Sequence, residues 1–270
     1  MKENHVKQLW AQGQPALCGW ISSGNAFVAE VMAAQGYDIL TIDMQHGLAD
    51  EAAALGILQS IRATAATPFV RVPWLDPAAI MKALDNGALG IICPMINSRE
   101  QAEQLVSYVR YPPAGTRSFG PTRANFALGS DYAQHADEQI LAFAMIETRE
   151  AMQNLGEIVT TPGLDGVYIG PADLTLGLTG RRYPAGFDRQ EPEIIEAIKE
   201  ILHAAHDAGL RAALHCGSPS YARQAVEWGF DMVTVSNDVR LLASAAAASV
   251  AAFRDPGTHA SAAANKTGSY

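Results

Sequence analysis

Two carboxylates, Glu147 and Asp173, each follow a short apolar run, and about one strand-plus-helix unit separates them along the chain. If the two runs are neighbouring strands of a parallel sheet, the carboxylates come close together at one edge of that sheet. Two carboxylates without a nearby pair of His or Cys ligands favour a hard cation such as Mg²⁺ or Mn²⁺, whose other ligands would be water and substrate oxygens. The structural alternative is that Glu147 pairs with Arg149 and that Asp173 caps a short helix.

A second group combines a carboxylate, a histidine and a guanidinium. Asp43 ends an apolar run, His46 follows closely, and Arg71 lies inside the apolar segment FVRVPW. A carboxylate beside a histidine can fix its tautomer and raise its basicity, which gives an acid–base pair; a half-buried histidine bound to the backbone is the alternative. Because a charge inside an apolar strand is seldom buried alone, we expect Arg71 to aim a bidentate guanidinium at a carboxylate or an oxyanion.

Weaker signals lie around these groups. In the segment GPAD, the backbone N–H groups of Ala172 and Asp173 could bind an anion, whereas Pro171 has no N–H to donate. Trp20, at the end of an apolar run, could form a wall of the pocket or belong to the core. His215 ends another apolar run, and we expect it to support the structure or the site without binding substrate.

Eight short apolar runs, rich in Val, Ile, Leu and Ala, indicate parallel strands that are buried on both faces. They are Ala16–Ile21, Asp38–Asp43, Pro68–Val72, Gly90–Pro94, Leu141–Glu147, Asp165–Ile169, Arg211–His215 and Asp231–Ser236. Segments with helical periodicity and capping signals alternate with them. These are Ala26–Gln35, Asp50–Arg62, Pro77–Asn86, Ser98–Val109, Glu191–Ala208, Ser218–Trp228 and Val239–Phe253.

This alternation predicts a single α/β domain, a closed (β/α)8 TIM barrel, over residues 1–254. An open, doubly wound sheet is the alternative, but no GxGxxG follows the first strand. In a TIM barrel the active site lies at the carboxyl ends of the strands, where all the candidate groups fall. Tyr111–Glu138 and Gly177–Arg189 exceed the usual loop length, so we expect them to be functional and to select the substrate. The small, polar tail, residues 255–270, is predicted to be disordered.

Composition narrows the class of partner. The net charge of −9 argues against nucleic acid and against an anionic membrane surface. The N-terminus lacks the apolar core of a secretory signal, and no apolar stretch approaches the roughly 20 residues of a membrane span. Cys18, Cys93 and Cys216 are few and far apart, which predicts reduced core thiols in a cytoplasmic protein rather than a disulfide framework.

The chain resembles the HpcH/HpaI family of class II pyruvate aldolases over about residues 16–250. The stretches that carry the resemblance are AEVMAAQGYDILTIDMQHG, FVRVPW, LDNGALGIICPM, RYPPAGTRSFG, MIETREAMQN and GLDGVYIGPADL. The resemblance implies a barrel with a divalent cation (Mg²⁺, Mn²⁺ or Co²⁺) and no organic cofactor. The implied reaction is the reversible aldol cleavage or addition between pyruvate or hydroxypyruvate and an aldehyde.

By position, the resemblance implies that Glu147 and Asp173 are the metal ligands and that Arg71 lies beside the oxo-acid oxygen. It implies that His46 is the acid–base residue and that Asp43 is its paired carboxylate.

The implied substrate-binding set is Arg71, the backbone of Ala172 and Asp173, and the side chains of Trp20 and Gln45. The last helix, Val239–Phe253, is implied to be exchanged between subunits of a homohexamer, a trimer of dimers.

The chain departs from the family pattern at two positions. Gln45 stands where the best-known members have a glutamate. Met145 stands where members often have a glutamine, so a polar contact near the substrate is missing or comes from another residue. The segments MQHG and RSFGPTR are most similar to members that use hydroxypyruvate or pyruvate with small aldehydes.

Three alternatives remain open. The first is a lyase for an acyl-CoA ester, like the citrate lyase β branch, with Arg117, Arg123 and Arg181–Arg182 as candidates for binding CoA phosphates. The second is metal-assisted decarboxylation of oxaloacetate as a side activity. The third is a non-catalytic barrel that binds a metabolite, which would tolerate losing one of the catalytic groups, although all are present. A Schiff-base lysine is not expected, because Lys82 lies within a predicted helix and not at a strand end.

Overall fold

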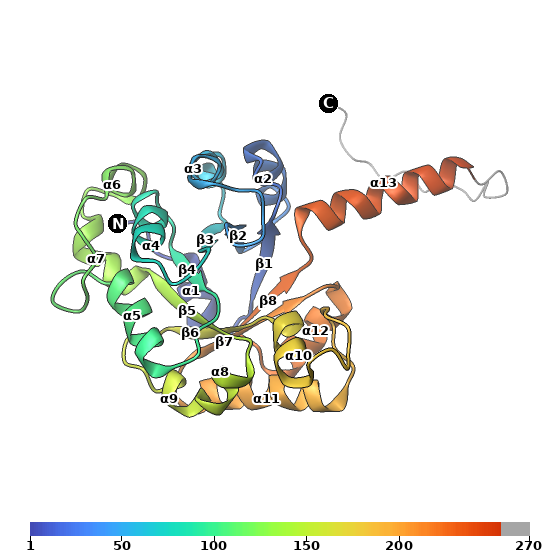
Figure 1. Cartoon of the computed structure of the whole chain (residues 1–270). Helices are drawn as coiled ribbons and strands as arrows, with labels where there is room; N and C mark the ends of the chain where they lie inside the picture. The colour runs from blue at the N-terminus through green and yellow to red at the C-terminus, as the bar shows by residue number, and fades with distance from the viewer. Residues whose placement is uncertain (255–270) are drawn as a thin grey trace.

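The computed structural model describes residues 1–254, so the tail predicted to be disordered, residues 255–270, lies outside the described residues. Within residues 1–254, eight parallel strands close into a barrel in chain order, with β8 paired back to β1 (Figure 1). The predicted (β/α)8 TIM barrel is thereby confirmed. The strands are β1 (Ala16–Ile21), β2 (Ile39–Asp43), β3 (Thr67–Arg71), β4 (Gly90–Cys93), β5 (Leu141–Ile146), β6 (Gly166–Ile169), β7 (Arg211–Cys216) and β8 (Met232–Val235).

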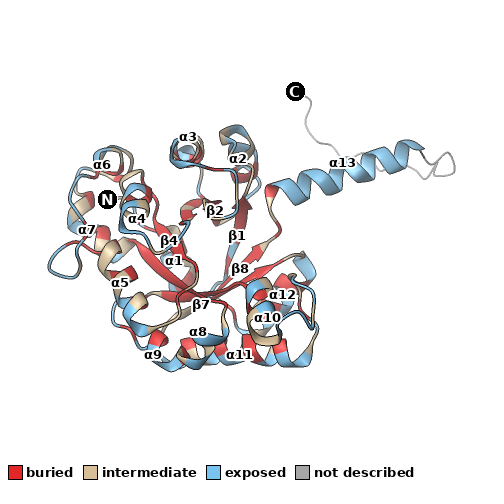
Figure 2. Cartoon of the chain, in the orientation of Figure 1, coloured by how far each residue is buried: buried red, intermediate tan, exposed pale blue. Residues whose placement is uncertain are grey.

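The strands are buried on both faces, as their unbroken apolar runs predict (Figure 2). Inside the barrel, large side chains such as Trp20, Phe69, Phe143 and Tyr168 form one hydrophobic cluster, while the outward side chains pack under the helices. At the amino ends of the strands, α1 (His5–Ala11) closes the barrel. Its Trp10 packs against Phe143 and donates Nε1–H to a backbone carbonyl 2.9 Å away. The opposite end, at the carboxyl ends of the strands, is therefore the end available for a site.

The predicted capping residues begin their helices. Asp50, Asp76, Ser98 and Ser218 each accept a hydrogen bond from a backbone N–H in the first turn of the helix that follows. The helices that match the predicted segments are α2 (Ala26–Ala33), α3 (Glu51–Ser60, continued by the 3-10 turn Ile61–Ala63), α4 (Pro77–Asp85), α5 (Arg99–Val109), α11 (Pro192–Asp207), α12 (Pro219–Trp228) and α13 (Asp238–Arg254). Short helices missed by the prediction are α8 (Arg149–Gln153), α9 (Leu155–Val159) and α10 (Pro171–Thr179).

The segment Tyr111–Glu138, predicted as a long loop, is partly helical in the structure. It contains α6 (Thr122–Leu128) and most of α7 (Tyr132–Gln139), which lie beside α4 (Figure 1). Arg117 donates to the Asp85 carboxylate at 2.8 Å, and the segment lines no part of the cavity at the carboxyl ends of the strands. This segment therefore packs helices of the chain together, and its role in selecting a substrate stays a prediction.

The last helix, α13, projects away from the barrel and is exposed along its length (Figures 1 and 2). Only its first residue, Asp238, is buried, and its carboxylate accepts hydrogen bonds from the backbone N–H groups of Ser22 (2.8 Å) and Ser23 (3.1 Å). Where an eighth helix would cover β8 and β1, the surface carries an apolar groove of about 450 Å³.

The cysteines match their prediction. Cys18, Cys93 and Cys216 are buried and form no disulfide, and burial raises the pKa of the Cys18 thiol to about 11. They are therefore unreactive core residues. None of the helices in residues 1–254 combines the length and the apolar character that a membrane span requires.

Candidate active site

A cavity of about 480 Å³ lies at the carboxyl ends of the strands. Side chains from several strand ends and from the following loops line it. Of the predicted site residues, it brings together Trp20, Asp43, His46, Arg71, Glu147, Ala172 and Asp173. Gln45 does not line the cavity: its backbone N–H donates to Asp43, and its Oε1 is buried without a hydrogen-bond partner among residues 1–254.

Arg71 and Asp43 form a buried ion pair because the barrel register places them side by side on β3 and β2. The Arg71 Nε donates to Asp43 Oδ1 at 2.9 Å, and Nη2 donates to Oδ2 at 2.6 Å. Trp20 donates its Nε1–H to the same carboxylate at 3.2 Å, and its ring lies 4.9 Å from the guanidinium carbon. Burial tends to raise the pKa of Asp43, but the hydrogen bonds and charge of Arg71 outweigh it, so this pKa is lowered. The two hydrogen bonds to the carboxylate thus fix the orientation of the guanidinium plane.

The expected side-chain pair of Asp43 and His46 is not what the structure shows. Asp43 Oδ1 accepts from the backbone N–H of His46 at 3.2 Å, while the rest of the carboxylate binds Arg71 and Trp20. The His46 side chain is exposed and lines the cavity. Asp43 therefore fixes the turn that carries His46 and does not set the tautomer of its imidazole in this structure.

Glu147 immediately follows β5, and its side chain is buried, with 2% of its surface exposed. Its Oε1 accepts from the backbone N–H of Met95 at 2.9 Å. Met95 has a left-handed backbone, with φ at 58°, which costs energy in a residue other than glycine and aims that N–H at the carboxylate. Arg149, the structural alternative partner, instead donates to the backbone carbonyl of Leu178.

The charge of Glu147 is not balanced by an ion pair within residues 1–254. Burial raises the pKa of Glu147 to about 7, and Asp173 adds to the rise, although the Met95 N–H and Arg71 oppose it. A buried carboxylate that shares a cavity with a second carboxylate favours a proton or a cation between them. Glu147 and Asp173 therefore form a candidate cation site.

Gly170 leaves room for the Glu147 carboxylate beside the start of α10. It precedes α10, so the N–H groups of Ala172 and Asp173 in the first turn have no partner inside the helix. A Cβ at Gly170 would overlap Oε2 of Glu147 and lie 3.0 Å from the Met145 Cε. The glycine leaves this space open, and the helix start favours an anionic group beside it.

The donor set fits a hard divalent cation. No group of three or more His, Cys, Asp or Glu side chains in residues 1–254 is arranged to hold a metal ion. Glu147 and Asp173 would thus supply two carboxylate ligands and leave the remaining positions to water and substrate oxygens, as Mg²⁺ and Mn²⁺ sites commonly do.

Comparison with known proteins identifies the family of this chain. Residues 17–245 match the family described as HpcH/HpaI aldolase/citrate lyase. The chain belongs to this family. The hydroxypyruvate/pyruvate aldolase of Rhizorhabdus wittichii is 44% identical to this chain over 243 residues. The matched residues cover 90% of this chain and 96% of the relative. The 4-hydroxy-2-oxo-heptane-1,7-dioate aldolase of Shigella flexneri is 35% identical over 254 residues, with 93% of each chain covered.

The fold of this HpcH/HpaI chain is also that of a solved relative. The crystal structure of an HpcH/HpaI aldolase/citrate lyase family protein from Burkholderia cenocepacia matches it with a TM-score of 0.85 and 31% identity. The match covers 93% of this chain and 100% of that one. The family resemblance predicted from the sequence motifs is confirmed.

Several contributors to the site were missed at the sequence level. Met95 contributes a backbone N–H, for which no side chain gives a signal. Tyr168 lines the cavity from inside β6, and Arg240 lines it from the first turn of α13. Phe187 lies in the segment Gly177–Arg189, which was expected to be functional, and it reaches the cavity. His215, predicted to play a supporting role only, lines the cavity as well.

Proposed function

We propose that this protein is a metal-dependent aldolase that reversibly joins pyruvate or hydroxypyruvate to an aldehyde. The observation that carries the proposal is the buried Glu147 carboxylate, which forms no ion pair with a residue of 1–254 and shares a cavity with Asp173 and Arg71. The names of the 44% and 35% identical relatives support the reaction class. The buried free cysteines fit a reducing, cytoplasmic setting.

Glu147 and Asp173 would hold Mg²⁺, Mn²⁺ or Co²⁺, which supplies Lewis-acid polarisation of the keto oxygen of the 2-oxo acid when bound. The backbone N–H groups of Ala172 and Asp173 bind the substrate carboxylate at the start of α10. Arg71, which Asp43 orients through two hydrogen bonds, donates to the keto oxygen as negative charge develops there.

His46 handles the proton at the other end of the bond. In the cleavage direction it accepts the proton of the C4 hydroxyl as the C3–C4 bond breaks, and in synthesis it returns that proton. Its exposed position at the cavity suits exchange of the proton with solvent. Met145 stands where members of the family often have a glutamine, and it offers only an apolar surface to the substrate.

Metal removal tests the proposed function. Protein treated with a chelator should lose aldol cleavage and addition with pyruvate, and Mg²⁺, Mn²⁺ or Co²⁺ should restore both. Formation of pyruvate from a 4-hydroxy-2-oxo acid, coupled to its enzymatic reduction, measures the rate. As a control, borohydride with pyruvate should leave the protein mass unchanged, because no lysine forms a Schiff base. Full activity in the chelated protein, or a borohydride-trapped adduct, would contradict the proposal.

Three of the four arginines that could bind CoA phosphates in the acyl-CoA alternative are engaged in other contacts. Arg117 is buried against Asp85, and Arg123 donates to the backbone carbonyl of Leu58, so neither is available to CoA phosphates. Arg182 pairs with Glu193 at the surface. We therefore favour a small 2-oxo acid as the donor.

We also propose that α13 of one copy packs into the apolar groove of another, within a hexamer built from dimers. Val239, Leu242 and Phe253 are exposed large apolar residues on α13. The groove between β1, β8, α2 and α12 is apolar and of about 450 Å³. A projecting helix and an uncovered groove on the same chain are complementary in the way that helix exchange requires.

Substitutions on the two proposed partners test this exchange. Leu242→Glu on α13 and Leu17→Glu in the groove should each convert the wild-type hexamer into smaller species, because both would bury an unpaired carboxylate in the contact. Light scattering after gel filtration measures the mass. Glu103→Ala, on the exposed side of α5, serves as the control and should leave the mass unchanged. A monomeric wild-type protein, or two hexameric variants, would contradict helix exchange.

A further inference from the structure

His215 takes part in a hydrogen-bonded chain inside the barrel. Its Nδ1 lies 2.9 Å from the hydroxyl of Tyr168, which lies 2.7 Å from Oγ1 of Thr234. Tyr168 and Thr234 are fully buried, while His215 keeps 8% of its surface exposed and lines the cavity. One imidazole nitrogen is therefore bound to the protein, and Nε2 makes no hydrogen bond to another residue of 1–254.

The chain of hydroxyls favours one tautomer of His215. Burial lowers the pKa of the imidazole to about 3, and Arg71 adds to this effect, so the ring is neutral at ordinary pH. A phenol is a better donor than an aliphatic hydroxyl, and an imidazole nitrogen is a better acceptor than a phenol oxygen. Thr234 therefore donates to Tyr168, and Tyr168 donates to Nδ1. The remaining proton of the imidazole sits on Nε2.

Two aromatic rings hold the imidazole in place. Trp20 meets it edge to face at 4.8 Å between ring centroids, and Phe187 packs against it at 4.6 Å. Around His215 the wall of the cavity is thus formed by these two aromatic rings, and the Arg240 guanidinium carbon lies 5.3 Å from the centroid of the Phe187 ring. A donor held among aromatic rings discriminates between ligands that can and cannot accept a hydrogen bond.

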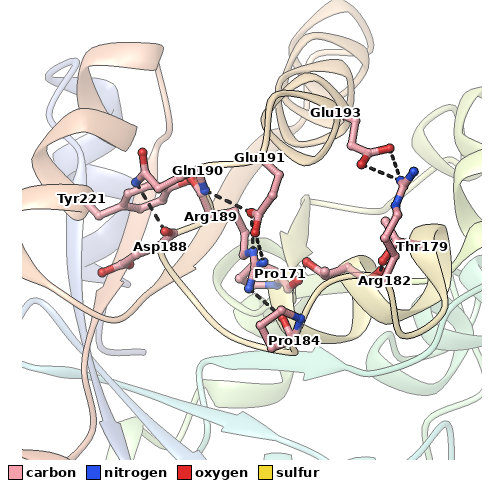
Figure 3. A network of polar contacts seen from close by, with 11 residues as sticks. Pro171, Thr179, Arg182, Pro184, Asp188, Arg189, Gln190, Glu191, Glu193 and Tyr221 are labelled. Atoms are coloured by element: carbon pink, nitrogen blue, oxygen red, sulfur yellow. Dashed lines mark hydrogen bonds and ion pairs between the residues drawn. The ribbon is translucent and has the colours of Figure 1, made fainter.

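The loop that carries Phe187 is fixed rather than loose (Figure 3). Arg189, buried between Pro184 and Glu191, donates Nη1–H to the Pro184 carbonyl at 2.9 Å and binds the Glu191 carboxylate through Nε and Nη2. Asp188 accepts the N–H of Gly217, just after β7, at 2.7 Å. The Arg189 contacts brace the loop internally up to the start of α11, and the Asp188 contact ties it to the end of β7, the strand that carries His215.

Trp20 contacts both this wall and Arg71, which is proposed to bind the 2-oxo acid. Its ring centroid lies 4.9 Å from the Arg71 guanidinium carbon, and it meets the ring of His215, on β7, edge to face. Glu147, Asp173 and Arg71 come from other strand ends. His215 is therefore placed at the part of the cavity left for the second substrate.

We propose that His215 is a specificity-determining residue that donates a hydrogen bond from Nε2 to the hydroxyl of a 2-hydroxyaldehyde acceptor. The proposal rests on the aldolase function proposed above and names the class of aldehyde it uses. Tyr168 is a positioning residue, because it acts only by holding the Nε2–H tautomer.

Two aldehydes of the same size test this inference. Glycolaldehyde carries the hydroxyl, and propanal has a methyl group in its place. With pyruvate as donor, His215→Phe should lower the kcat/KM ratio of glycolaldehyde to propanal by about 10-fold or more, while the propanal value changes little. His215→Gln, which keeps an N–H donor, should retain part of the preference. Leu48→Ala is the matched control, because Leu48 lines the same cavity without a side-chain donor, and this change should affect both aldehydes alike.

A second measurement does not depend on any variant. Nitrogen-15 chemical shifts of labelled histidine should show His215 neutral with the proton on Nε2, and Tyr168→Phe should change this tautomer signature and lower the glycolaldehyde preference. A proton on Nδ1 in the wild type, or an unchanged aldehyde ratio in His215→Phe, would overturn the proposal.

Failure of this inference is distinguishable from failure of the aldolase function. Exchange of the pyruvate methyl protons for deuterium needs the metal and the donor site but no aldehyde. If exchange occurs in the wild type and in His215→Phe and the aldehyde ratio does not change, His215 has no role in selection and the aldolase function stands. If the metal-loaded wild type shows no exchange, the aldolase function itself is wrong and this inference falls with it.

Discussion

Replacing Arg71 by lysine should lower kcat for aldol cleavage by about 100-fold or more, although the positive charge is kept. The guanidinium makes two hydrogen bonds to Asp43 and still has N–H groups for the keto oxygen, whereas a lysine ammonium cannot reproduce this flat, forked arrangement. Because the lost contact strengthens as charge develops on that oxygen, kcat should fall more than KM rises. Steady-state kinetics with a 4-hydroxy-2-oxo acid measure both constants.

The control for Arg71→Lys is Arg99→Lys, since Arg99 pairs with Glu103 on the exposed surface of α5. That variant should keep the wild-type rate. Thermal unfolding should accompany the kinetics, because breaking a buried ion pair can cost about 3–5 kcal/mol in stability. A correctly folded Arg71→Lys variant with near-normal kcat would remove Arg71 from the mechanism.

Replacing Glu147 by glutamine should abolish aldolase activity, lowering kcat by roughly 1,000-fold or more, and should also remove the stabilisation that divalent cations give to the folded protein. The same substitution should make the metal-free protein more stable at about pH 8. Both effects have one cause, since the carboxylate that a cation would need is buried and uncompensated in the metal-free protein.

The sign of the pH effect follows from the raised pKa. The folded-state pKa of Glu147 is about 7, above the unfolded-state value of about 4.3, so the folded protein binds the extra proton between these values. Stability from this group is present below the unfolded-state pKa and is lost as the pH rises through about 7, by roughly 4 kcal/mol in total. Glu147→Gln does not titrate and escapes this loss.

Denaturant unfolding of metal-free protein at several pH values measures the effect. Wild type and Glu147→Gln should be similar near about pH 4 and diverge as the pH rises towards about 8. Adding Mg²⁺ or Mn²⁺ at the higher pH should stabilise the wild type only. A difference in stability that does not vary with pH would mean that Glu147 is not held in the environment described here.

The barrel could be predicted because parallel strands covered on both faces leave a clear apolar pattern, and its strand ends then placed Glu147, Asp173 and Arg71 at one cavity. The partner of Asp43 could not be predicted in the same way. His46 is its near neighbour in sequence, but the β2–β3 register places Arg71 beside it, and register depends on the whole barrel. Roles for Glu147, Asp173, Ala172 and His46 remain predictions for the experiments above.

The remaining differences have local physical reasons. The Met95 contact is a backbone N–H in a left-handed conformation, which no residue type announces. The prolines and glycines near Tyr111 suggested a long functional loop, yet α6 and α7 follow them and pack beside α4. His215 lies near the end of an apolar strand, a position that in sequence does not separate a cavity residue from a core residue. Its contacts with Phe187 and Trp20 depend on the closed barrel.

The indole of Trp20 contacts two walls of the cavity that come from different parts of the chain. Arg71, in the first wall, is fixed by β2 and β3, while His215 and Phe187, in the second wall, belong to β7 and the loop before α11. Substitutions in that second wall can accumulate without moving the carboxylates or the guanidinium. The architecture thus makes acceptor choice evolvable on its own, and directed evolution of this barrel toward new aldehydes should draw its productive changes from β7 and residues 180–190.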